Sequence, residues 1–75
     1  MRYRIYLKLP AMKNYGAIGG GYIVSKLVHA EMWEDLETAT KCFDGLVRDN
    51  PAEWKWQIRD VNNKVIRRFE ELKAC

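Results

Sequence analysis

The amino-acid sequence predicts a small α+β domain in which one helix packs on one face of an antiparallel sheet. Three patterns support this fold class. Polar and apolar side chains alternate over residues 2–9 and again over 54–59, and apolar residues between 36 and 47 recur at helical spacing. The predicted order of elements is β-β-α-β-β. Because a single helix covers only one face of a sheet, we expect two layers, with the other face open to water or to a partner.

The length of the chain limits what it can contain. Its 75 residues, of which 48 % are hydrophobic, are typical of one globular domain, 1–75, rather than of a disordered chain. A chain of this size buries only about 60 % of its surface on folding, so it forms one modest core and leaves little room for a deep active-site cleft.

Residues 2–9 predict the first strand, which Pro10 ends because proline cannot donate a hydrogen bond to a sheet. Residues 10–21 are rich in glycine and predict a loop. Three apolar side chains lie in this loop. They either fold back over an edge of the core or stay exposed as contact points. They belong to Met12, Tyr15 and Ile18.

Residues 22–28 are rich in β-branched side chains and predict the second strand. Residues 29–33 could extend this strand, or the helix could begin early. We favour the strand because Asp35 is a good N-cap immediately before an apolar-periodic segment. The helix is predicted over 36–48, and Asn50-Pro51 is typical of a helix end.

Residues 54–70 predict a terminal hairpin. Its turn contains two asparagines, which tolerate a left-handed backbone conformation. A three-residue loop with Asn63 left-handed pairs Asp60 with Lys64 and Ile58 with Ile66, whereas a two-residue turn shifts the partner of Asp60 by one residue. We prefer the first register because it matches charge with charge and apolar with apolar.

The predicted open face of the sheet is basic and carries two aromatic rings. It is expected to present Arg2, Arg4, Tyr6 and Lys8 from the first strand, and Lys55, Gln57, Arg59, Val65, Arg67 and Phe69 from the hairpin. A solvated face, a protein-binding face and a nucleic-acid-binding face all fit this pattern. The candidate partner-binding residues are Arg4, Tyr6, Lys8, Tyr15, Lys55, Arg59, Arg67 and Phe69.

Charge is distributed unevenly along the chain. The net charge is +3, but residues 34–53 are acidic, whereas 1–33 and 54–75 are basic. The acidic segment includes the predicted helix, so the helix layer and the open sheet face should differ in charge. A basic face of this kind permits an acidic partner.

No catalytic, cofactor or metal site is predicted. The glycines at 16 and 19–21 are followed by a strand instead of the Lys and Ser/Thr that phosphate-binding loops use. His29 is the only histidine, and it has no suitable ligand or nucleophile partner in the sequence. Cys42 and Cys75 are expected to be free thiols in a reducing compartment, with a disulfide or a metal pair as the alternative. Since no signal peptide or membrane span is evident, we expect a cytoplasmic protein.

Residues 33–39 and 56–66 resemble a pattern found in small phage and prophage accessory proteins, including anti-CRISPR and other anti-defence inhibitors. In this pattern a strand ends in an aromatic residue, an acidic cap opens a helix, and a hairpin carries a D-x-N-[GN]-K turn. The resemblance implies a non-enzymatic protein that binds a larger host protein or protein complex and modulates it by steric occlusion. The alternative is a small nucleic-acid-binding protein, and an unpaired edge strand also allows a homodimer.

Overall fold

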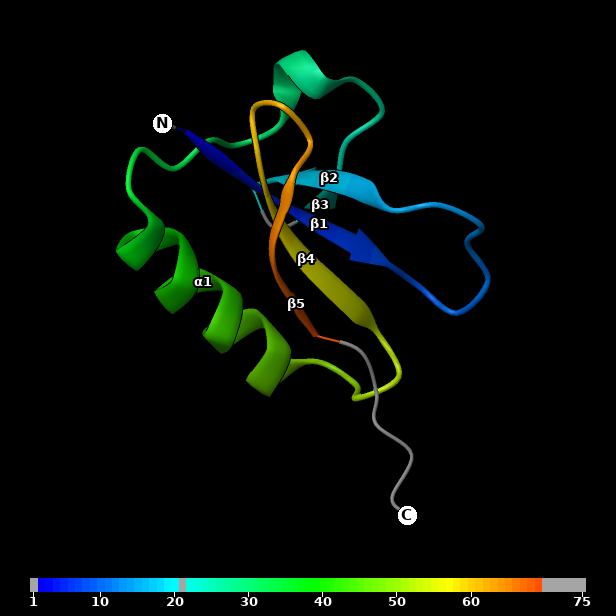
Figure 1. The fold of residues 1–75 in the computed structure, drawn as a ribbon. Coiled ribbons are helices and arrows are strands. Elements are labelled where there is room, and N and C mark those ends of the chain that lie inside the picture. Colours follow the sequence, from blue (N-terminus) through cyan, green and yellow to red (C-terminus); the bar gives the residue numbers. More distant parts are fainter. Residues whose placement is uncertain (1, 21, 70–75) are drawn as a thin grey trace.

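The computed structural model describes residues 2–20 and 22–69 and confirms the α+β fold class. Its five antiparallel strands form one sheet in the order β3-β2-β1-β4-β5. The helix α1 lies along one face of this sheet and packs on the two central strands, β1 and β4 (Figure 1). The elements are β1 (Tyr3–Lys8), β2 (Gly16–Gly19), β3 (Tyr22–Ile23), a 3₁₀ turn η1 (Leu27–His29), α1 (Leu36–Asp49), β4 (Lys55–Asp60) and β5 (Val65–Phe69).

The second predicted strand differs from the observed one. Instead of one strand over 22–28, the structure has two short strands, β2 and β3. The first of them, β2, lies within the predicted loop 10–21. The chain reverses next to Gly20, whose φ of 61° is left-handed, so that β2 and β3 pair with each other. Glycine adopts this conformation without steric cost. The order β-β-α-β-β holds, with β2 and β3 in place of the second strand.

The segment after β3 neither extends that strand nor begins the helix early. Residues 27–29 form η1, and the Glu31 N–H then donates to the Ile18 carbonyl at 3.0 Å. Trp33 and Tyr3 exchange two backbone hydrogen bonds of 2.8 and 2.9 Å. The segment therefore completes the edge of β1 beyond the point where β2 ends.

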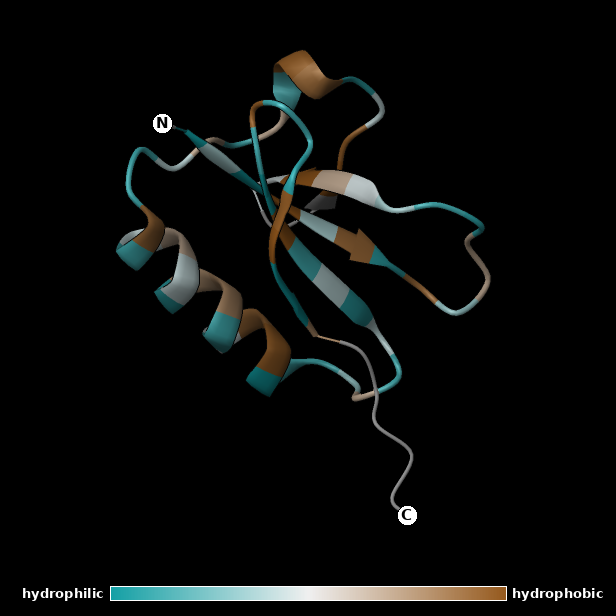
Figure 2. Cartoon of the chain, viewed as in Figure 1, coloured by the Kyte–Doolittle hydropathy of each residue, from teal (hydrophilic) through white to brown (hydrophobic). Residues whose placement is uncertain are grey.

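The core lies between α1 and the sheet. Ile5 and Ile58 face each other across β1 and β4, and neither is exposed at all. Phe43 and Ala39 cover them from α1, whose hydrophilic residues lie along the side away from the sheet (Figure 2). The buried cluster consists of Ile5, Leu7, Ile18, Ala39, Phe43, Trp56 and Ile58.

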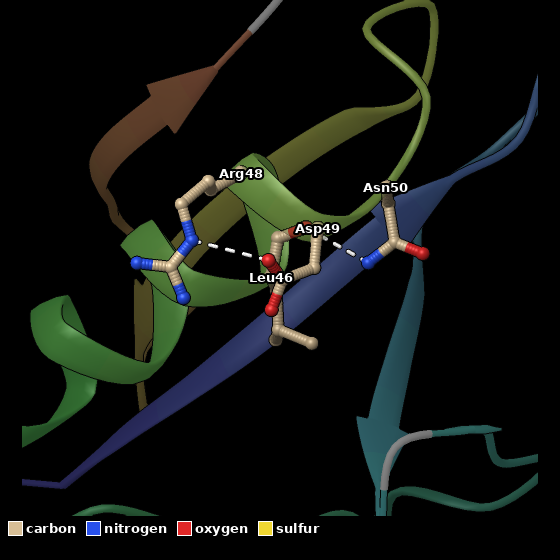
Figure 3. A network of polar contacts seen from close by, with 4 residues as sticks. All are labelled: Leu46, Arg48, Asp49 and Asn50. Atoms are coloured by element: carbon tan, nitrogen blue, oxygen red, sulfur yellow. Dashed lines mark hydrogen bonds and ion pairs between the residues drawn. The ribbon is translucent and has the colours of Figure 1, made fainter.

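Side chains cap both ends of α1. The predicted N-cap is confirmed, since Asp35 Oδ1 accepts from the Thr38 N–H at 2.8 Å. At the other end, Asn50 Nδ2 donates to the Leu46 carbonyl at 2.8 Å (Figure 3). These bonds satisfy backbone groups that have no partner inside the helix. The helix ends at Asp49, one residue later than predicted.

Replacing Asp35 with alanine should lower the denaturation midpoint at neutral pH. Hydrogen bonds from Thr38 hold the pKa of Asp35 below its ordinary value. A carboxyl group whose pKa is lowered in the folded state contributes stability above its unfolded pKa of about 4, and the contribution disappears as the pH falls through the folded value. The difference in midpoint between wild type and variant should therefore shrink in acid.

Urea unfolding followed by circular dichroism across this pH range tests the cap. Asp44→Ala is the matched control, because it removes an exposed carboxylate from the same helix without removing a cap. A midpoint difference for Asp35→Ala that is as large in acid as at neutral pH would show that the Thr38 bonds do not carry the effect.

The turn of the β4–β5 hairpin agrees with the prediction, but the strand register does not. Asn63 is left-handed with φ 66°, and the Asp60 N–H donates to the Lys64 carbonyl at 3.0 Å. Ile58, however, pairs with Arg67 instead of Ile66, because a β-bulge shifts the register after the turn. One extra residue in a strand sends every later side chain to the opposite face.

The bulge overturns two predicted positions on the open face. Arg67 and Phe69 lie on the helix side, where the Arg67 guanidinium is 5.9 Å from the Phe43 ring centroid and Phe69 packs against the core. Arg68, which pairs with Gln57, takes a place on the open face instead. Glu70, the last residue of the predicted hairpin, lies outside the described residues, as does Cys75.

Candidate anion-binding cleft

Two like-charge pairs lie on the open face of the central strands. Arg4 stands directly opposite Arg59, and Lys8 directly opposite Lys55. Like charges at directly opposed positions of an antiparallel pair destabilise the sheet. Natural proteins break such local rules mainly at functional sites, where another requirement prevails.

A cleft of about 310 Å³ opens beside these pairs. β1 and β4 supply Lys8, Lys55 and Arg59, and the loop between β1 and β2 supplies the remaining side chains. Its lining therefore holds four cationic groups, one amide and one phenol, and no carboxylate. The lining residues are Lys8, Lys13, Asn14, Tyr15, Lys55 and Arg59. None of the ion pairs formed within residues 2–20 and 22–69 involves these cations.

Arg59 is held in place by its neighbours on the open face. Its Nε donates to Gln57 Oε1 at 2.8 Å, and its guanidinium carbon lies 4.3 Å from the centre of the Tyr6 ring and 5.4 Å from that of Tyr15. Tyr6 is only 4 % exposed and donates its hydroxyl to Asn63 Oδ1 at 3.3 Å. The guanidinium is therefore fixed, while the four N–H bonds on its terminal nitrogens are not used by Gln57.

The structure brings together six of the eight predicted site residues. Arg4, Tyr6, Lys8, Lys55 and Arg59 share the open face, and Tyr15 reaches Arg59 from the loop. The alternation alone suggested that Tyr6 presents its ring to solvent. Instead, the ring lies beneath Arg59 and is buried. The two that lie elsewhere are Arg67 and Phe69.

Sequence reasoning missed two residues of the cleft, Lys13 and Asn14. Both residues come just before Tyr15, which was a candidate. The positive charge of Lys13, two residues before Tyr15, was a signal that the loop joins the basic face. Arg68 was missed for a different reason, because the bulge is not visible in the alternation of β5.

The other residues considered for chemistry lie apart from the cleft. His29 is exposed on η1. Cys42 is a half-buried free thiol on α1, and burial, followed by the charge of Glu31, raises its pKa. The described ranges, 2–20 and 22–69, contain no group of three residues that could hold a metal ion. They also contain no helix long and apolar enough to cross a membrane.

Comparisons with family models, with curated proteins and with solved structures found no match to this chain. The inference of function therefore depends on the geometry and charge of the open face. The resemblance to small phage-encoded inhibitors stays a prediction.

Proposed function

We propose that this chain is a non-enzymatic binding module that docks its open sheet face on an acidic surface of a larger protein. The observation that carries this proposal is the set of four cations around one cleft without a carboxylate in its lining. Acidic side chains of a partner would relieve the repulsion within the pairs Arg4–Arg59 and Lys8–Lys55. Complementary charge also accelerates encounter and fixes the orientation of the complex.

A protein partner fits the open face better than single-stranded nucleic acid. Proteins that bind single strands stack bases on exposed aromatic rings. Here Tyr6 is 4 % exposed and lies beneath a guanidinium, and Phe69 packs against the core on the other face. The face offers cations for salt bridges, but these two rings are not available as a stacking platform.

The module would act by occupying a surface that its partner needs for another contact. This role corresponds to the inhibition of a host protein complex that the resemblance to phage and mobile-element proteins implies, and it would operate in the bacterial cytoplasm. Occlusion needs no reaction and no cofactor, only a fixed complementary surface. Pairing with a second copy of the chain is a separate candidate role, because β5 is an edge strand of the sheet and an edge strand can pair with another strand.

A tagged pull-down from bacterial lysate, with and without nuclease, tests the proposal when wild type is compared with a charge-reversed variant. In Lys55→Glu/Arg59→Glu, a partner captured by the wild type in a nuclease-resistant manner should be lost, because the cleft then carries two carboxylates. Binding of the purified partner should weaken by about a hundredfold, since charge pairs at interfaces are each worth about 1.5 kcal/mol or more.

Lys26→Glu/Lys41→Glu is the matched control. It makes the same change in net charge at two exposed lysines, neither of which lines the cleft, and it should retain the partner. Circular dichroism must show that both variants keep the fold. Capture that disappears with nuclease, or that survives reversal of Lys55 and Arg59, would overturn the proposal.

A further inference from the structure

We infer that the basic cleft binds a small molecule carrying two adjacent phosphoryl groups, such as inorganic pyrophosphate or a nucleoside diphosphate. This goes beyond the proposed docking function, because it requires no protein partner and concerns only the six residues that line the cleft.

The density of positive charge indicates the class of ligand. Four cations surround about 310 Å³ with no carboxylate in the lining. A carboxylate brings one negative charge, whereas a phosphoryl group brings about 1.5 to 2 charges and three acceptor oxygens. A diphosphate therefore carries almost as much negative charge as the lining carries positive charge. The volume of the cleft lies at the lower end of the range of about 300–1,000 Å³ for small-molecule sites.

The donors are of the kinds that recognise phosphate. Arg59 can offer a planar fork of N–H groups to two phosphate oxygens, whereas the lysines act as point charges. The ring of Tyr6 and the amide of Gln57 already fix this guanidinium in the free protein. Little side-chain freedom then remains to be lost on binding, which increases affinity.

The cross-strand arrangement places cations at two separate positions in the cleft. Lys8 and Lys55 form one directly opposed pair, and Arg59 lies further along the same face of β4, beyond Gln57. Lys55 and Arg59 are four residues apart along β4, so their backbones are separated by about 13 Å, and their long side chains can bring the charged groups closer together. Two linked phosphoryl groups can engage both positions, whereas a single phosphate engages one.

Isothermal titration calorimetry of the purified protein at low salt tests this inference with pyrophosphate, ADP, phosphate and sulfate as probes. We expect one saturable site for pyrophosphate and for ADP, each bound at least about tenfold more tightly than phosphate or sulfate, because the second phosphoryl group adds charge-assisted hydrogen bonds. Arg59→Lys should weaken pyrophosphate binding by about tenfold, although the charge is unchanged, because the fork is lost.

Arg68→Gln is the matched control. It removes one positive charge from the same face outside the lining and should leave the pyrophosphate affinity within about twofold, whereas Lys55→Gln should reduce it by about tenfold. Absence of saturable binding, equal affinity for phosphate and pyrophosphate, or equal effects of Arg68→Gln and Lys55→Gln would overturn the inference. Because no protein partner is present, such a failure is distinguishable from failure of the docking proposal.

Discussion

Replacing Ile58 with alanine should lower the free energy of unfolding by about 2–5 kcal/mol, the usual cost of removing a large aliphatic side chain from a core. Ile58 has no exposed surface and lies opposite Ile5, which is equally buried. A domain of 75 residues is stable by about 4–11 kcal/mol at the usual value per residue. One substitution would therefore remove a large part of the stability of the whole fold.

Urea unfolding followed by tryptophan fluorescence measures this loss, because Trp56 is buried in the same cluster. Val61→Ala is the control. Val61 is 46 % exposed on the hairpin turn, so its replacement should change the unfolding free energy by no more than about 0.5 kcal/mol. Equal effects of the two substitutions would mean that Ile58 does not lie at the centre of the core.

Replacing Gly19 with alanine should destabilise the protein by about 3 kcal/mol, at the upper end of the usual cost of overpacking. A Cβ at this position would collide with the His29 carbonyl oxygen and crowd the Glu31 nitrogen. The collision is with backbone, so it cannot be relieved by a change of rotamer. The chain after η1 would have to move away from β2, and the Glu31 amide, which bonds to Ile18, should exchange faster with solvent.

The neighbouring Gly20 separates the effect of space from the effect of backbone conformation. Nothing lies within 4 Å of a Cβ at Gly20, but its φ of 61° is left-handed. Gly20→Ala should therefore cost only about 1–2 kcal/mol, and Gly20→Asn less, because asparagine tolerates this region. Amide exchange at Glu31 should stay slow in both. Fast exchange in all three variants would show that close approach at Gly19 is not what holds this segment.

Elements specified by near neighbours in the chain could be predicted from the sequence. The alternation over 2–9 identified β1, and Asp35 with Asn50 identified the two ends of α1 within one residue. The hairpin turn was predictable because Asn63 tolerates a positive φ. In each case the stabilising contact joins residues close together in sequence, or the pattern repeats along a single element.

Elements that depend on distant partners could not be predicted in this way. β2 contains two glycines and shows no alternation, and it becomes a strand because β1 supplies its hydrogen bonds. For the same reason, only part of the cleft could be predicted from the sequence. The positions of Lys8, Lys55 and Arg59 follow from the period of two along a strand, whereas Lys13 joins them only through the path of a loop.

The bulge in β5 also has a consequence for how this surface could diversify. It determines which of two adjacent arginines, Arg67 or Arg68, belongs to the open face and which lies over Phe43. If Ile66 joined the regular ladder opposite Ile58 and the bulge were lost, the two arginines would exchange roles and Phe69 would turn outward. A change in this hairpin that removes the bulge would thus place an aromatic side chain on this edge of the open face, a larger change in binding chemistry than most single substitutions provide.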